Sequence, residues 1–144
     1  MILCDVNVFI RAHKEGTDQH EHFAKWLTEA LEGDETFGVS EHVLSAFVRI
    51  VTNRRAFDPP SSLDDALAFA DQVRDHGNVS LVSPGPRHWH IFMRLCREAG
   101  AKGNLIPDAY FAASAIESGS TWITTDRDFA RFPGLRWRHP LAQR

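Results

Sequence analysis

The sequence predicts an α/β domain built on a mainly parallel β-sheet. Short apolar runs, typical of buried strands, alternate along the chain with segments whose apolar residues recur at helical spacing. Glycine and proline separate these segments, and no repeat, linker or low-complexity stretch interrupts the alternation. We therefore expect residues 1–144 to form a single domain.

The first third of the chain supplies two strand–helix units. A strand at 2–4 enters a loop at Asp5, and a helix is expected over 17–32, ended by glycine. A second strand at 36–40 leads into a helix over 41–52. The apolar positions that define the first helix are Phe23, Trp26, Leu27, Ala30 and Leu31.

The rest of the chain repeats the alternation after a clear break at Asp58-Pro59-Pro60. Ser61 followed by Asp64 resembles a capping box, and Pro107 suits the first turn of a helix. The expected elements are helices over 62–76, 87–98 and 107–118, and strands at 79–82, 121–124 and 135–137.

Composition limits the possible functions. With a net charge of −3, the protein cannot hold nucleic acid by overall charge and would need basic patches or bound cations. Cys4 and Cys96 fit neither a disulfide framework nor a zinc motif. No apolar run reaches the ~18 residues of a membrane span, and no basic leader precedes Asp5. We expect a cytoplasmic protein without a membrane partner.

Acidic residues gather where the predicted strands end. Asp5 follows the first strand, Glu41 the second, and Asp126 and Asp128 the fourth, while Asp108 lies in the first turn of a helix. In open α/β sheets, ligands bind beyond the carboxyl ends of the strands. These carboxylates are therefore expected at one edge of the sheet, although Asp128 can equally be a turn residue.

Clustered carboxylates repel one another unless a cation neutralises them. Oxygen-only ligands select hard cations, so we expect Mg²⁺, with Mn²⁺ as a second possibility. A metal held in this way activates water and stabilises charge that develops on a phosphate. The chemistry that these residues predict is phosphodiester hydrolysis.

Short motifs along nearly the whole chain resemble the PIN-domain ribonucleases, and in particular the VapC toxins of bacterial toxin–antitoxin pairs. The strongest are Met-Ile-Leu-Cys-Asp-Val-Asn-Val-Phe-Ile at 1–10, Pro-Asp-Ala-Tyr-Phe-Ala-Ala at 107–113 and Thr-Thr-Asp-Arg-Asp-Phe at 124–129. Phe-Val-Arg-Ile-Val-Thr-Asn at 47–53 and Phe-Pro-Gly-Leu at 132–135 add to them.

The resemblance implies a three-layer α/β/α sandwich and magnesium-dependent cleavage of RNA. It also implies a small antitoxin of the VapB type that blocks the site, and a homodimer. By position, Asp5, Asp108 and Asp126 match the acids that hold the metal, and Asn7 and Thr124 match polar residues beside it.

One position departs from the family pattern. Many members carry a glutamate six residues after the small residue that ends the second strand, and here that position is Ala46. Glu41 is the nearest acid that can replace it, and we expect it to act in catalysis. The alternative is that Glu41 only favours the helix dipole.

Two other functions stay open at this point. An aspartate-nucleophile phosphatase would use Asp5, but such enzymes resemble an Asp-x-Asp pattern and here the third position is Asn7. A PIN-fold module that binds RNA or protein without catalysis is supported by Ala46. Zinc binding by the paired histidines is disfavoured, because positions i and i+2 of a helix face different ways.

Basic residues offer candidates for RNA binding. Arg49 lies in one basic group, and Arg136-Trp137-Arg138 forms another that can contact phosphates or stack on bases. A solvated surface or a protein interface explains these residues equally well.

Overall fold

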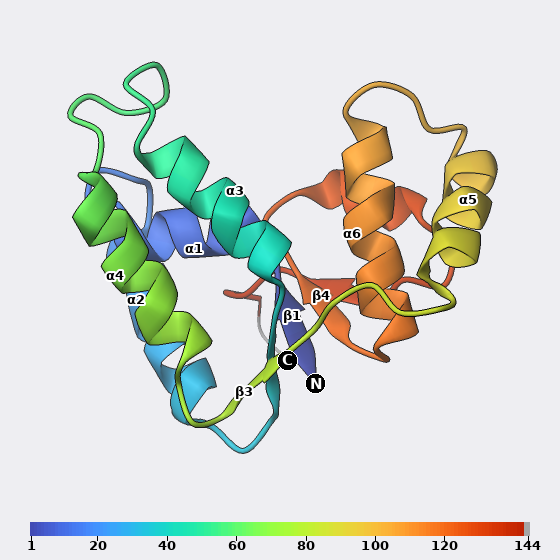
Figure 1. Ribbon diagram of the computed structural model, residues 1–144, viewed down its shortest axis with the longest axis horizontal. Helices are drawn as coiled ribbons and strands as arrows, with labels where there is room; N and C mark the ends of the chain where they lie inside the picture. The colour runs from blue at the N-terminus through green and yellow to red at the C-terminus, as the bar shows by residue number, and fades with distance from the viewer. Residues whose placement is uncertain (143–144) are drawn as a thin grey trace.

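A computed structural model describes residues 1–142, so the last two residues of the predicted domain lie outside the described part. Its centre is a parallel five-stranded sheet in the order β3-β2-β1-β4-β5 (Figure 1). The strands are β1 (Ile2–Cys4), β2 (Phe37–Val39), β3 (Val79–Leu81), β4 (Thr121–Ile123) and β5 (Trp137–Arg138).

Helices connect the strands and cover both faces of the sheet. They are α1 (Val6–His13), α2 (His20–Glu32), α3 (Glu41–Val51), α4 (Leu63–Arg74), α5 (His88–Ala99) and α6 (Leu105–Glu117), with the 3₁₀ helix η1 (Arg127–Arg131) after β4. Figure 1 shows α1 to α4 on one side of the sheet and α5 with α6 on the other. The predicted α/β/α sandwich is therefore confirmed, as right-handed crossovers from this strand order require.

The three inner strands, β2, β1 and β4, are the most deeply buried part of the sheet. Ile2, Leu3 and Cys4 of β1 are almost fully buried, as parallel strands covered on both faces must be. In β4, Trp122 is inaccessible to solvent and stacks on Phe111 of α6, with ring centroids 5.9 Å apart. This packing fixes α6 against the strand that precedes Asp126 and Asp128.

The structure adds two helices that sequence reasoning did not place. The segment after Asp5 is helical from Val6, because the Asp5 side chain caps α1 by accepting a hydrogen bond from the Val6 N–H. Asp126 caps η1 in the same way through the Asp128 N–H. The predicted capping box at Ser61 was wrong by one residue, since Ser62 is the N-cap of α4.

The sheet has a topological switch point between β1 and β4. From β1 the chain moves outward to β2 and β3, and then crosses to β4 and β5 on the other side. Adjacent strands whose connections diverge leave a crevice at their carboxyl ends, where α/β proteins place their ligands. Asp5 follows β1 and Asp126 lies three residues after β4, so both acids sit at this crevice.

Within residues 1–142, no helix has the length and apolar character needed to cross a membrane.

Candidate active site

Asp5 is held by three hydrogen-bond donors. It follows β1 directly and is only 5% exposed. The Val6 N–H donates to Oδ1 at 2.7 Å, while the Thr124 hydroxyl and the Asn7 amide donate to Oδ2 at 2.8 and 3.2 Å. These donors orient the carboxylate and stabilise its ionised form.

Thr124 joins Asp5 to the loop that carries Asp126. Its hydroxyl donates to Asp5 and accepts a hydrogen bond from the Asp126 N–H at 3.0 Å. Asn7 strengthens the same junction, because its amide oxygen accepts from the Thr125 N–H at 3.2 Å. Asn7 and Thr124, which the family resemblance places beside a metal, thus position the acids at the ends of β1 and β4.

Asp126 and Asp128 have different surroundings. Asp126 is partly buried and its Oδ1 accepts from the Asp128 N–H at 2.9 Å. Asp128 is exposed, and its carboxylate lies 3.9 Å from Arg131. Asp128 still acts on the site, since its charge raises the pKa of Asp108.

Asp108 joins Asp5 and Asp126 from α6, in the helical layer on the other side of the sheet from α1. It lies in the first turn of α6 and is partly buried. Its pKa is raised to about 6, first by burial and then by the negative charges of Asp126, Asp5 and Asp128. The pKa of Asp5 is also raised to about 6, first by burial and then by Asp126, against the hydrogen bonds that lower it.

The segments after β1, after β4 and at the start of α6 thus bring their carboxylates close enough to raise one another's pKa. The donors are oxygen only, which suits a hard divalent cation such as Mg²⁺ or Mn²⁺. Within residues 1–142, no three His, Cys, Asp or Glu side chains already converge in a metal-binding geometry. The aspartates therefore fit the metal by donor type and by their mutual repulsion, and not by a closed ligand shell.

Glu41 pairs with an arginine of the neighbouring helix α4. Its carboxylate is exposed and accepts a hydrogen bond from Arg74 of α4 at 2.9 Å. The charges that raise the pKa of Asp108 come from Asp126, Asp5 and Asp128 only. The geometry thus gives no support to Glu41 as a substitute for the acid missing at Ala46, and its catalytic role stays an untested prediction.

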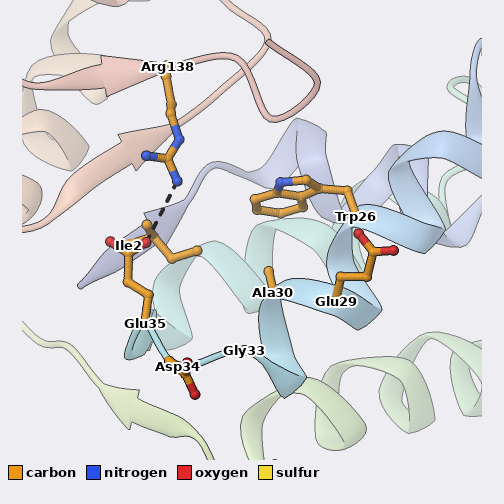
Figure 2. Close-up of a pocket in the computed structure, with 8 residues that line it drawn as sticks. All are labelled: Ile2, Trp26, Glu29, Ala30, Gly33, Asp34, Glu35 and Arg138. Atoms are coloured by element: carbon orange, nitrogen blue, oxygen red, sulfur yellow. Dashed lines mark ion pairs between the residues drawn. The ribbon is translucent and has the colours of Figure 1, made fainter. Parts of the chain in front are cut away.

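Of the three arginines proposed as RNA contacts, Arg49 and Arg136 lie away from the acids. Arg49 lines a groove between α3 and α4. Arg136 donates to the carbonyl of Gly119, which precedes β4 at the opposite edge of the sheet. Arg138 extends toward Glu35, with 3.8 Å between the charged atoms (Figure 2). Arg138 also lines a pocket beside Thr125, whereas neither Arg49 nor Arg136 lines that pocket.

Sequence reasoning overlooked Arg127. It follows Asp126 directly and lines a pocket beside the crevice together with Thr125 and His139. The signal was present in the sequence, because a basic residue adjacent to a strand-end acid shares its edge of the sheet. Arg127 was missed because the sequence analysis predicted no helix at 127–131, and the 3₁₀ helix found there leaves Arg127 exposed.

The parallel sheet, its switch point and the acids at that point define a class of protein. The model of the PIN domain family matches residues 2–135, and the chain belongs to this family. Within it, the chain is similar to the VapC ribonuclease Mb2897 of Mycobacterium bovis, at 42% identity over 98% of this chain and 96% of that protein. It is similar also to ribonuclease VapC25 of Mycobacterium tuberculosis, at 41% identity over 97% of this chain and 99% of the relative.

Solved structures support the same fold. VapBC2 from Rickettsia felis, bound to a DNA fragment from its promoter, superposes with a TM-score of 0.71 at 17% identity, covering 96% of this chain and 98% of that one. VapC20 of Mycobacterium tuberculosis, described as a Sarcin-Ricin loop cleaving toxin, gives 0.64 at 18% identity over 94% and 99%. At such identities the likeness establishes the fold alone.

Proposed function

We propose that the chain is a divalent-metal-dependent endoribonuclease and the toxin of a VapBC-type toxin–antitoxin pair. One observation carries the proposal: β1, β4 and α6 bring Asp5, Asp126 and Asp108 into one mutually repelling cluster at the switch point of the sheet. The relatives named VapC ribonucleases, at up to 42% identity over nearly the full length, support the same activity.

Asp5, Asp108 and Asp126 would hold Mg²⁺, with Mn²⁺ as an alternative. When bound, the cation supplies an activated water and stabilises charge on the scissile phosphate. Asn7 and Thr124 keep the Asp5 carboxylate oriented through their hydrogen bonds to Oδ2. Asp126 is positioned through its N–H on Thr124.

The partners follow from the same proposal. Structures of VapBC complexes from Rickettsia felis and Haemophilus influenzae share this fold, so a small VapB-like antitoxin is the expected partner. We further propose an RNA substrate, a homodimer, a single domain over 1–144 and, from the RNA substrate, a cytoplasmic location.

Cleavage of single-stranded RNA tests the enzyme. The purified protein should cut RNA with Mg²⁺ or Mn²⁺ and stop in EDTA. Asp5→Asn should abolish cutting, whereas Asp64→Asn, the same change on the exposed surface of α4, should leave it unchanged. Undiminished cutting by Asp5→Asn, or in EDTA, contradicts the mechanism.

The same assay distinguishes the alternative function. A PIN-fold module that only binds RNA or protein is favoured by Ala46 and by the pairing of Glu41 with Arg74. Such a module would bind RNA with no cleavage under any metal. Metal-dependent cleavage that is lost in Asp5→Asn excludes it.

A further inference from the structure

We propose that a pocket of about 610 Å³ next to the acidic crevice binds one nucleotide of single-stranded RNA that flanks the scissile phosphate. The inference rests on the proposed ribonuclease function and names a substrate contact centred on Arg127. Of the arginines suggested by the sequence, only Arg138 lines this pocket. The pocket lies where η1 and β5 meet the start of α2. Its lining includes Thr125, Arg127, Ala130, Trp137, His139 and Leu141.

The pocket adjoins the loop that carries Asp126. Thr125 forms part of its wall, and the Thr125 N–H donates to Asn7, which in turn donates to Asp5. Asp126 follows Thr125, and Arg127 on its other side lines the pocket. An RNA strand whose phosphate lies at Asp126 therefore has this pocket within reach of the adjoining nucleotide.

The charge of the pocket suits a phosphate. Within residues 1–142, Arg127 is exposed and has no carboxylate at ion-pairing distance. Burial and the charges of Arg11 and Arg127 lower the pKa of His139, which shows that the three side chains share a positive region. The described lining contains no aspartate or glutamate, although the protein as a whole carries a net charge of −3.

The remaining walls suit a base. Trp137 offers an aromatic face, and Ala130 and Leu141 add apolar surface. Stacking on aromatic side chains is the usual way in which proteins hold single-stranded bases. Gln19 also lines the pocket, and its exposed side chain does not cap α2, so its amide can contact the polar edge of a base.

A second pocket, on the other side of Arg138, provides a contrast. It measures about 440 Å³ and is lined by Trp26 together with Glu29, Asp34 and Glu35 (Figure 2). Three carboxylates repel a phosphate, and Arg138 is already drawn to Glu35. Of the two pockets that share Arg138, only the one with Arg127 has the charge that RNA requires.

Binding of a labelled ten-nucleotide single-stranded RNA, measured by fluorescence polarisation in EDTA, tests the pocket without cleavage. Arg127→Gln should weaken binding about tenfold and reduce the slope of log K against log salt by about 0.7, the value for one phosphate contact. Arg131→Gln is the matched control, because it removes the same charge from the same 3₁₀ helix outside the pocket. Its effect should stay below about twofold.

A second pair of variants separates the effect of charge from any effect of the substitution on folding. Ala130 is exposed, so Ala130→Glu places a carboxylate in the pocket, and Ala130→Gln adds similar bulk without charge. Ala130→Glu should weaken RNA binding several-fold more than Ala130→Gln. Equal effects of the two, or equal effects of Arg127→Gln and Arg131→Gln, overturn the assignment.

Other outcomes are equally decisive. If the wild type cuts RNA and Arg127→Gln binds it normally, the pocket proposal fails while the ribonuclease proposal stands. If Arg127→Gln loses antitoxin binding and keeps RNA binding, the pocket belongs to a protein partner and the RNA assignment is wrong. If the wild type neither binds nor cuts RNA, both proposals fail.

Discussion

Asp108 carries an electrostatic penalty that hydrogen bonds do not relieve. Burial and three neighbouring carboxylates raise its pKa to about 6, and within residues 1–142 no hydrogen bond to its side chain compensates. Asp5 has the same pKa but is stabilised by Thr124, Val6 and Asn7. Of the two acids, Asp108 is thus the one whose charge most plainly disfavours folding without a cation.

Asp108→Asn should therefore make the metal-free protein more stable at neutral pH. Because the folded pKa of about 6 exceeds the ordinary value of 3.8, the ionised carboxyl disfavours folding fully above pH 6 and not at all below 3.8. After allowance for solvent screening, the gain is about 1 kcal/mol, or roughly 3 °C in Tm. Thermal unfolding in EDTA across this pH range measures it.

Added Mg²⁺ provides the control. The wild type should gain stability from the cation and the variant much less, since binding to the folded state stabilises by mass action. A fall in Tm for Asp108→Asn in EDTA at neutral pH would contradict the repulsion that we assign to this site.

Glu41→Gln tests the one acid whose role the geometry does not support. Its carboxylate is exposed and bonded to Arg74, so we expect turnover to stay within about twofold and Tm to fall slightly. Arg74→Gln, which removes the other half of the ion pair, should match it. A loss of about 100-fold in turnover for Glu41→Gln alone, the scale of one preorganised catalytic group, would restore the catalytic role predicted from the sequence.

At the scale of elements, the site depends on how the ends of β1 and β4 are joined. The two strands are paired in register from Ile2 with Thr121 to Cys4 with Ile123, so Asp5 and Thr124 come out side by side. Thr124 is fully buried and its hydroxyl links Asp5 to the Asp126 backbone. One hydroxyl therefore sets the relative position of two acids from distant parts of the chain.

Thr124→Val should lower kcat by about 10–100-fold, the usual effect of removing a group that orients metal ligands. It should also cost about 1–3 kcal/mol of stability, because the Asp126 N–H loses its acceptor. The Thr124 hydrogen bond lowers the pKa of Asp5, so the acid limb of the pH–rate profile should move to higher pH. Thr124→Ser should restore both values, and a normal pH profile in Thr124→Val would refute this positioning role.

At the scale of the whole molecule, negative and positive side chains gather in two neighbouring regions. The catalytic crevice is acidic, the pocket beside it is basic, and the net charge is −3. Under the proposed function, RNA would be held by this local basic region and by the metal, and not by a general positive field. The proposed activity would then depend on a cation both for chemistry and for the approach of the phosphate.

Expression in a bacterial host tests the whole protein as a toxin. The wild-type chain should arrest growth, and co-expression with the small protein encoded beside it should restore growth. Asp108→Asn should be harmless at an equal protein level, because it removes an acid that we propose to hold the metal and should leave the fold intact. If wild type and Asp108→Asn slow growth equally, the toxin assignment is wrong, although a nuclease activity could remain.

The sequence alone determined the strand–helix alternation, the parallel sheet and the acids at its carboxyl edge. Local patterns suffice for these because buried parallel strands read as apolar runs, and a strand end fixes the edge at which the next residue emerges. The inner strands β1, β2 and β4 follow this rule, whereas β3 and β5 at the two edges are only partly covered. The motifs around Asp5, Asp108 and Asp126 also sufficed to indicate the family that the comparisons confirm.

Only the tertiary structure decided which side chains meet. Helix α1 was not expected, because Asp5 reads equally as a loop residue until its carboxylate is seen to cap Val6. Glu41 and Arg74 are 33 residues apart, and Arg138 and Glu35 pair across the molecule, so no local pattern shows that these charges are already engaged. Arg127 faces the basic pocket because η1 turns it outward beside His139. Pairing between distant charges depends on how helices pack against the sheet, and this packing is settled only when the whole core forms.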